Sequence, residues 1–562
     1  MSYAGLFANN GLPLGLGSIM AFGNPNISLF EDVAALFANS EQGAWYDPSD
    51  TSTMYQDSQG TTPVTAIAQP VGLILDKSKG LTLGPELISN GGFATDTVWT
   101  KGIGWTIGSG NAQAATPLGA AAISQAEAIV SGRPYKITFN VVSISAGSVT
   151  LQFTGTGTQS GPTFTTTGLK TCILIANANY TTFGILAAIG TIATIDDVSA
   201  KELPGNHAFQ TTTTKLPLWS ARVNLLTKTE DFGDAVWIPA NLTVTTNAVS
   251  APDGAMTADL ISMPAVSSGY SIIYRNSTTL SGTFSDSVYL RGVNGGEIVY
   301  LFYLVDGVYV NKECVLTTSW QKFSFSFSGG TVCFWHLGVD LRAGSGQTAK
   351  PAQTIYAWGA SLVPADQASL PYQRVNTATD YDSVGFNKYL AFDGVDDALV
   401  TNSIDFTATD KMTVWAGVRK LSDTARGIIA ELSATSASNN GAFGMTAPNA
   451  ASATYAFESK GTALTDAVGT PFAAPLTSVL TGIASIASDV NILRVNGTQA
   501  DSDTGDQGTG NYGNYPLYIG SRAGTSLPFN GNLYSLIVRG AQSSDAQIAS
   551  TEQYVNSKTG AY

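Results

Sequence analysis

Apolar and polar residues alternate in short runs along most of the chain, and Gly, Asn and Pro separate the runs. Clear examples are residues 135–142 and 148–153, and further on residues 287–291 and 320–327. An alternation of period two places successive side chains on opposite faces of a strand, with one face toward a core. The pattern therefore predicts an all-β protein built from tandem antiparallel sandwiches.

The alternating runs fall into two similar blocks. Residues 86–93 (Glu-Leu-Ile-Ser-Asn-Gly-Gly-Phe) are followed by Trp99, and residues 224–232 (Asn-Leu-Leu-Thr-Lys-Thr-Glu-Asp-Phe) are followed by Trp237. Because Trp99 and Trp237 recur at matching places, we interpret them as core residues rather than as binding residues. The repeat predicts two successive domains of one fold.

Each block also ends on a strand, residues 194–200 in the first and residues 355–362 in the second. The first and last strands must meet if the unit is to hide its sheet edges, as in a jelly roll. Both blocks resemble the carbohydrate-binding-module type of jelly roll that recurs in phage tail proteins, with a Glu-Leu-x-x-Asn-Gly-x-Phe opening and an Ile-Asp-Asp-Val closing strand. The resemblance makes Asp196 and Asp197 candidate Ca2+ ligands in the first block, whereas the second block lacks this pair.

Two further alternating strands lie near the C-terminus, residues 390–400 (Leu-Ala-Phe-Asp-Gly-Val-Asp-Asp-Ala-Leu-Val) and residues 529–538 (Phe-Asn-Gly-Asn-Leu-Tyr-Ser-Leu-Ile-Val). Each lies beside a tight Gly turn, so we expect them to pair at the edge of one sandwich. Together they resemble the concanavalin A-like (laminin-G-like) lectin fold. In that family the acids matching Asp393, Asp396 and Asp397 chiefly form turns and occasionally help to hold Ca2+, and both alternatives stay open here.

Sugar recognition by such sandwiches needs aromatic faces beside amide and carboxylate groups. The segment 508–516 (Gly-Thr-Gly-Asn-Tyr-Gly-Asn-Tyr-Pro) offers both in the most loop-like surroundings of the chain. The candidate glycan-binding residues are Asn511, Tyr512, Asn514 and Tyr515. The alternative is that the two tyrosines only pack within the loop.

The N-terminal residues 1–27 form an apolar arm interrupted by Gly and Pro, which cannot hold a regular helix or strand for long. Residues 28–31 (Ser-Leu-Phe-Glu) offer a capping box and predict a short amphipathic helix over residues 29–39. We expect its apolar face to anchor the chain on another subunit; packing on the chain's own next domain is the alternative. The anchoring residues are Leu29, Phe30, Val33 and Phe37.

Residues 45–50 (Trp-Tyr-Asp-Pro-Ser-Asp) are followed by Gln-Asp-Ser at 56–58 and Pro-Val-Gly at 70–72. This order resembles a segment common in tail and virion-surface proteins of tailed bacteriophages. Its turns separate very short strands, so we expect a connector. The resemblance implies a virion protein synthesised in the host cytoplasm, with other phage virion proteins as partners of its N-terminus and a homotrimer as its assembly.

Composition narrows the function classes. The net charge of −14 and the 12% of charged residues argue against nucleic acid as a partner, because phosphate binding needs clustered Lys and Arg. We also expect no membrane span, because no uncharged apolar run is long enough, and no secretory leader, because no Lys or Arg precedes Lys77. With only His207 and His336, both interpreted as structural, we assign no catalytic residues and expect no enzyme.

The leading hypothesis is a phage tail fibre, appendage or head fibre that anchors by its N-terminus and binds host cell-surface glycans. The alternatives are a glycan depolymerase with appended binding modules and a passive capsid decoration protein. The predicted organisation is an anchoring arm and helix (1–44), a connector (45–82), a first jelly roll (83–204), a linker (205–222), a second jelly roll (223–376) and a concanavalin A-like lectin domain (377–562).

Overall fold

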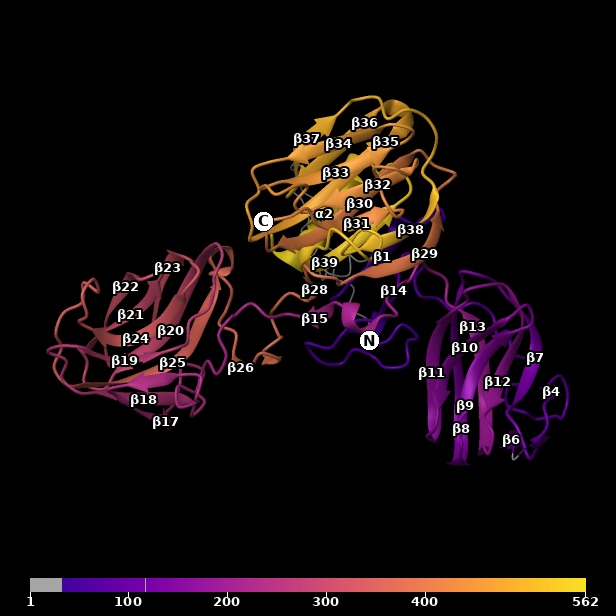
Figure 1. The fold of residues 1–562 in the computed structure, drawn as a ribbon, viewed down its shortest axis with the longest axis horizontal. Coiled ribbons are helices and arrows are strands. Elements are labelled where there is room, and N and C mark those ends of the chain that lie inside the picture. The colour runs from indigo at the N-terminus through magenta and orange to yellow at the C-terminus, as the bar shows by residue number, and fades with distance from the viewer. Residues whose placement is uncertain (1–32, 117) are drawn as a thin grey trace, which may run out of the picture.

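The computed structural model describes residues 33–116 and 118–562, and this part of the chain is almost entirely β-structure (Figure 1). The strands form three lobes, drawn from purple through rose to yellow in chain order, and each lobe is built from two antiparallel sheets. The predicted fold class, tandem antiparallel β-sandwiches, is thereby confirmed. A helix that the sequence analysis missed, α2 (Asp545–Thr559), lies near the C-terminus.

The first jelly roll holds its core between two five-stranded sheets. Their orders are β10-β9-β12-β7-β4 and β11-β8-β13-β6-β5. The strands are β4 (Thr100–Lys101), β5 (Trp105–Gly108), β6 (Asn111–Ala115), β7 (Ala121–Ile129), β8 (Pro134–Ala146), β9 (Val149–Thr154), β10 (Thr158–Phe164), β11 (Gly168–Ile175), β12 (Tyr180–Ala187) and β13 (Ile192–Glu202).

The second jelly roll repeats this topology strand for strand. Its sheets have the orders β22-β21-β24-β19-β16 and β23-β20-β25-β18-β17, which are those of the first jelly roll with twelve added to each number. The strands are β16 (Ile238–Ala240), β17 (Thr243–Val249), β18 (Ala258–Met263), β19 (Tyr270–Tyr274), β20 (Thr283–Gly292), β21 (Ile298–Val305), β22 (Val308–Val315), β23 (Gln321–Ser328), β24 (Cys333–Asp340) and β25 (Gln353–Pro364).

Matching tryptophans anchor the two copies. Trp99 packs against Phe93 with ring centroids 5.1 Å apart, and Trp237 packs against Phe232 at 4.8 Å. Each indole donates a hydrogen bond to a backbone carbonyl nine residues earlier, at 3.0 and 2.8 Å. Both rings are buried, so their predicted role in the core is confirmed. The shared anchor also gives a common register in which positions of the two copies can be compared.

The C-terminal sandwich has sheets of order β15-β28-β39-β30-β35-β36-β37, with β1 also on β39, and β2-β3-β14-β29-β38-β31-β32-β33-β34. One large core lies between them. The strands are β1 (Gly43–Tyr46), β2 (Met54–Tyr55), β3 (Leu73–Ile74), β14 (Ala208–Phe209), β15 (Leu218–Ser220), β28 (Tyr389–Asp393), β29 (Leu399–Asp405), β30 (Lys411–Lys420), β31 (Ile428–Leu432), β32 (Ala442–Thr446), β33 (Tyr455–Lys460), β34 (Leu464–Gly469), β35 (Leu476–Ser485), β36 (Val490–Val495), β37 (Thr498–Asp503), β38 (Asn514–Ile519) and β39 (Asn530–Arg539).

Residues 399–400 of the first expected strand belong to β29 in the other sheet, but the part in β28 pairs as expected, since Leu390 of β28 lies opposite Leu533 of β39. They are not at a sheet edge, however, because β39 also pairs with β30 and β15 flanks β28. A short hairpin of β26 (Val375–Thr377) and β27 (Asp380–Tyr381) precedes this sandwich.

The interpretation of residues 45–82 as a connector and of residues 205–222 as a linker is wrong. Strands β1, β2 and β3 from the first segment, and β14 and β15 from the second, belong to the sheets of the C-terminal sandwich. The chain therefore starts in this sandwich, leaves it for each jelly roll in turn and returns. These strands have two to four residues, and most of their partners are distant in the sequence, from Ile74 opposite Ala208 to Arg539 opposite Gly43, so alternation within one window could not identify them.

Asp47, directly after β1, holds helix α2 against the sandwich. Asp47 accepts hydrogen bonds from the Tyr554 hydroxyl at 2.9 Å and from Lys77 Nζ at 3.2 Å, and Lys558 Nζ lies 3.4 Å away. Burial alone would raise the pKa of Asp47, but Lys558 and Lys77 hold it below its ordinary value. Removing the carboxylate would leave two ammonium groups without this partner, so Asp47 is a structural residue.

The predicted N-terminal helix is described only from residue 33 onward, and residues 33–35 are helical. Leu29 and Phe30 lie outside the described residues. Val33 and Phe37 are buried in a cluster with Trp415 and Val555 of the chain's own C-terminal sandwich. Docking of these two residues on another subunit is therefore corrected to packing within the chain, because the apolar surface beside α2 already buries them.

Candidate functional site

An aromatic row crosses the outer face of the β22-β21-β24-β19-β16 sheet in the second jelly roll. In the register of these strands, Tyr274 lies opposite His336, and His336 lies opposite Phe302. The ring centroids of Tyr274 and His336 are 5.8 Å apart, those of His336 and Phe302 are 4.6 Å apart, and Tyr309 continues the row 5.8 Å from Phe302. Because the four rings come from four adjacent strands, the sheet itself fixes their spacing.

The row has a buried middle and accessible flanks. Phe302 is 0% exposed and His336 is 4% exposed, whereas Tyr274 and Tyr309 are half-buried. Phe334, also half-buried, lies two residues before His336 on the same face, with ring centroids 6.2 Å apart. The buried pair holds the half-exposed rings in place.

His336 contributes no charge to the row at neutral pH. Burial lowers its pKa to about 4. Its Nδ1 lies 3.0 Å from the backbone carbonyl of Phe334, which can only accept, so Nδ1 carries the proton. The histidine interpreted as structural is therefore a neutral member of the row.

Polar groups surround one end of the row. Tyr309 donates from its hydroxyl to Asp340 Oδ2 at 2.9 Å, and Arg342 pairs with the same carboxylate at 2.6 Å. Burial would raise the pKa of Asp340, but the hydrogen bonds from Arg342 and Tyr309 hold it below its ordinary value. Gln347 donates to Asn311 Oδ1 at 2.9 Å. Guanidinium, carboxylate and amide groups thus lie beside the rings.

This arrangement can bind a ligand that has an apolar face and a hydroxyl-rich edge. Half-exposed rings offer carbon surface with fixed spacing, and the polar groups offer directional hydrogen bonds. Asn311 and Arg342 are exposed, so both can reach a ligand.

The row was not predicted, although the sequence contains a pattern that indicates it. Residues 298–305 (Ile-Val-Tyr-Leu-Phe-Tyr-Leu-Val) and 333–340 (Cys-Phe-Trp-His-Leu-Gly-Val-Asp) are apolar or aromatic at nearly every position rather than at every second one. Strands of this kind cover both faces of a sheet with apolar side chains. In a jelly roll, where one face packs on the core, the second apolar face is the informative one.

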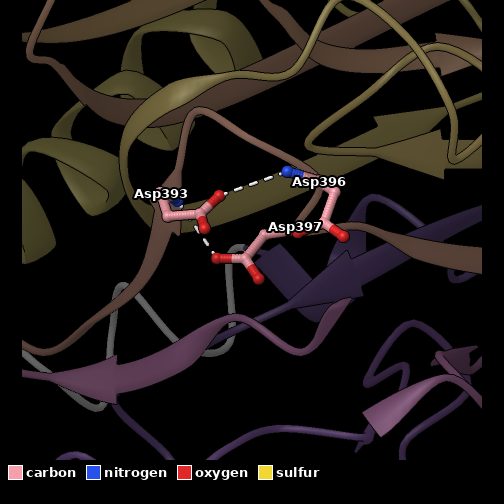
Figure 2. A group of neighbouring side chains, drawn as sticks. All are labelled: Asp393, Asp396 and Asp397. Carbon is pink, nitrogen blue, oxygen red and sulfur yellow. Dashed lines mark hydrogen bonds between the residues drawn. The ribbon is translucent and has the colours of Figure 1, made fainter. Parts of the chain in front are cut away.

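The acidic turn between β28 and β29 of the C-terminal sandwich brings three carboxylates together (Figure 2). Asp393 Oδ1 accepts from the backbone N–H groups of Val395 at 2.8 Å and of Asp396 at 3.3 Å, and Asp397 Oδ2 accepts from the Asp393 N–H at 3.0 Å. Burial and the neighbouring Asp393 and Asp396 raise the pKa of Asp397 to about 7. These hydrogen bonds stabilise a tight turn, which is one of the two roles expected for these acids.

In the described part of the chain, these three residues form a group that could hold a metal ion, because one carboxylate oxygen from each lies within 4.8 Å of the others. Carboxylates are suitable Ca2+ ligands, but Ca2+ takes six to eight oxygen atoms and three side chains supply only part of such a set. Ca2+ binding at this turn therefore stays a prediction.

Asp196 and Asp197 lie in β13, where a bulge interrupts the pairing with β8. Asp197 has a φ of +53° and donates its backbone N–H to Asp196 Oδ1 at 2.8 Å. The pair thus stabilises the bulge, and within the residues that the structure describes no third acid joins it in a metal-binding group.

The predicted glycan-binding loop is corrected at Tyr512. Its side chain is 1% exposed, and its hydroxyl lies 2.7 Å from the Ser459 hydroxyl, so it is a core residue that no sugar reaches. Tyr515 is half-buried and donates to the Asn440 carbonyl, and Asn511 donates to the Thr407 carbonyl. Asn514 is exposed. Glycan binding by Asn511, Asn514 and Tyr515 stays a prediction.

Comparison with known proteins gives no family. No protein-family model matches the chain, and no curated protein matches it. The chain is similar to the CBM40 domain of Ruminococcus gnavus IT-sialidase bound to alpha2,3 sialyllactose, with 17% identity over 25% of this chain and 83% of that one and a TM-score of 0.22. It is also similar to the tandem CBM22 domains of Xyn10C from Paenibacillus barcinonensis, with 12% identity over 50% and 98% of the chains and a TM-score of 0.22.

A further similar structure is the heptameric SAP-like pentraxin of Limulus polyphemus, with 13% identity over 30% and 80% of the chains and a TM-score of 0.23. Identities and TM-scores this low carry no argument about ligand or function. Among residues 33–116 and 118–562, no helix has the length and apolar character needed to cross a membrane.

Proposed function

We propose that the protein binds glycans and that the aromatic row of the second jelly roll is its principal glycan-binding surface. The observation that carries this proposal is the alignment of Tyr274, His336 and Phe302 in one register across the sheet, on the face that points away from the core. Pyranose rings have an apolar face of C–H groups that packs on aromatic rings. Their hydroxyl groups would meet Asn311 and Arg342 at the edge of the row.

The energetics favour an extended saccharide over a monosaccharide. One aromatic contact contributes about 0.5–1.5 kcal/mol beyond the area it buries, so a single sugar on a single ring binds weakly. Tyr274 and Phe334 are both half-buried and both neighbour His336, Tyr274 on the adjacent strand and Phe334 two residues earlier on the same strand. A chain of sugars that contacts both rings adds their contributions at little further entropic cost.

The biological setting is part of the same proposal and has a different basis. The resemblance of residues 45–50 and the triplets that follow to phage virion-surface proteins supports a tail fibre, appendage or head fibre whose other partners are virion proteins. A homotrimer, a place in the virion and a role without catalysis stay predictions. Mass spectrometry of purified particles tests this setting, and absence of the chain from the particles would contradict it.

A glycan array probed with the full chain tests the binding proposal, with Tyr274→Ser as the variant and Tyr515→Ser as the matched control. Both tyrosines are half-buried, and the second lies in the C-terminal sandwich. We expect wild type and Tyr515→Ser to bind the same glycans and Tyr274→Ser to lose them. Equal binding by all three proteins would contradict the proposal for the row, and loss only in Tyr515→Ser would move the site to the loop.

A further inference from the structure

A second place in the molecule is built to bind a ligand. A cavity of about 940 Å³ opens beside the end of the second jelly roll. Residues 220–226 and 275–280 form much of its wall, Tyr303 and Trp335 line its inner side, and Tyr389 of the C-terminal sandwich contributes from outside the jelly roll. Its volume falls within the range of about 300–1,000 Å³ typical of small-molecule sites.

Two arginines without a carboxylate partner face this cavity. Of the eleven arginines in the chain, all in described segments, eight pair with an Asp or Glu. Arg222 and Arg275 are two of the other three, and both line the cavity. Their charges are close enough to repel, since Arg222 contributes to lowering the pKa of Arg275, although burial is the larger cause.

The described residues that line the cavity do not balance this positive charge. No Asp or Glu is among the described residues that line the cavity, in a chain whose net charge is −14. Asp286, which accepts from Trp335 Nε1 at 3.0 Å, is fully buried, and burial raises its pKa well above the ordinary value. Asp234, which does not line the cavity, attracts Arg275 and so tends to raise its pKa, but it is already paired with Lys228 at 3.2 Å. The described lining of the cavity therefore carries two guanidinium groups and no carboxylate.

The first jelly roll shows that the fold does not need this charge. Thr100, which follows Trp99, lies opposite Ser124, and Gln125 comes next. In the second jelly roll, Ile238 follows Trp237 and lies opposite Tyr274, and Arg275 comes next. Gln125 and Arg275 therefore occupy the same position.

The two side chains also share one structural task. Gln125 exchanges hydrogen bonds with the backbone of Ser89, and Arg275 donates to the carbonyl and hydroxyl oxygens of Thr227 at 2.7 and 3.1 Å. Those two bonds use two of the five guanidinium N–H groups. A neutral amide performs the task in one copy, so this task does not require the charge of Arg275. The guanidinium of Arg275 also lies over the Trp237 ring, 4.8 Å from its centroid, and three of its N–H groups are not used by Thr227.

We infer that this cavity binds the carboxylate of an acidic saccharide, with Arg275 as the main ligand-binding residue and Arg222 as a second source of positive charge. The guanidinium of Arg222 donates hydrogen bonds chiefly to backbone carbonyls, including those of Asn224 and Leu225, and these bonds hold it at the cavity wall. Asn276 and Ser277, exposed next to Arg275, provide amide and hydroxyl groups for the sugar. That the ligand is a saccharide rests on the proposed function; its negative charge rests on the arginines.

Ligand-observed NMR titrations of the full chain with glucuronic acid and glucose test the inference, because these sugars differ by a carboxylate in place of a hydroxymethyl group. We expect glucuronate to bind roughly tenfold more tightly or better, as a charge-assisted hydrogen bond implies. Arg275→Gln, which copies the first jelly roll, should abolish the preference and leave the melting temperature unchanged. Equal affinity for the two sugars, or a preference that survives in Arg275→Gln, would overturn the inference.

Further measurements distinguish a sugar-binding site from a general anion site and from the aromatic row. Asn276→Asp is an isosteric change at an exposed site that adds a negative charge, so it should also weaken glucuronate binding. This variant keeps the inference testable if Arg275→Gln fails to fold. Unchanged glucuronate affinity in Asn276→Asp would count against the site. Inorganic phosphate that binds as tightly as glucuronate would show a site for any anion and overturn the assignment to a sugar. Tyr274→Ser should leave glucuronate binding intact, so failure of the aromatic row and failure of this cavity are distinguishable.

Discussion

The two jelly rolls share one topology but present different outer faces. On the equivalent sheet, the row that is aromatic in the second copy is polar in the first, although both faces point away from a well-packed core. The positions in the first copy are Ser124, Gly184, Gln152 and Thr158, and those in the second are Tyr274, His336, Phe302 and Tyr309.

The difference between the copies distinguishes residues that the fold requires from residues added to its outer face. Both copies keep the Trp–Phe anchor and an apolar inward face, so these features are common to the fold. The outward rings are an addition to one copy. Aromatic residues that the fold does without in a sister domain are best explained by a ligand.

Replacing the centre of the row gives the largest expected effect. Phe302→Gln installs the residue of the first copy where a fully buried ring stacks on His336. We expect a loss of about 3 kcal/mol in the unfolding free energy of the second jelly roll, because a large buried side chain is removed and an amide is left in apolar surroundings. Calorimetry of the full chain measures it. A change below about 1 kcal/mol would mean that the ring is not packed as described.

The pH dependence of stability should differ between the two copies. His336 has a folded-state pKa of about 4, below the ordinary 6.5, so the unfolded chain binds a proton more readily between these values. Stability from this residue is therefore complete above about pH 6.5 and is lost as the pH falls toward 4, by about 3 kcal/mol. The first jelly roll has Gly184 at this position and lacks the effect.

Thermal unfolding at pH 7.5 and 4.5, compared with His336→Gln, measures this dependence. His207, which has the same low pKa of about 4, belongs to a different part of the chain and remains in both proteins as a common background. If the variant keeps the same acid-induced loss in the second jelly roll, His336 is not its cause.

Tyr274→Ser tests the role of an accessible ring of the aromatic row in glycan binding. The half-buried ring should contribute little to stability, so we expect less than about 1 kcal/mol of destabilisation and about a tenfold weaker affinity for the bound glycan. Titration calorimetry with the best array glycan measures the affinity. Ser124→Ala at the matching site of the first copy is the control, and an equal loss of affinity there would break the comparison.

The smallest effect concerns the C-terminal sandwich. Tyr512→Phe removes a hydroxyl that is hydrogen-bonded to Ser459, and we expect about 1 kcal/mol of destabilisation with unchanged glycan affinity. A weaker affinity without loss of stability would restore Tyr512 as a binding residue.

The sequence predicted the fold class, the repeat and its tryptophan anchors because each depends on local alternation or on a motif within about ten residues of itself. It misplaced the segments with β1 and β15 because their pairing partners are distant in the sequence. Helix α2 was missed despite its capping box at Ser544 and Gln547. Tyr512 looked exposed in a Gly-rich loop, yet its burial depends on strands from elsewhere in the sandwich.

The most direct measurement is a crystal structure of the full chain with the glycan that binds best on an array. The account predicts a sugar ring packed on Tyr274 or Phe334 and at least one hydrogen bond to Asn311 or Arg342. Glycan density on the polar face of the first jelly roll, or only at the loop 508–516, with the aromatic row bare, would contradict it.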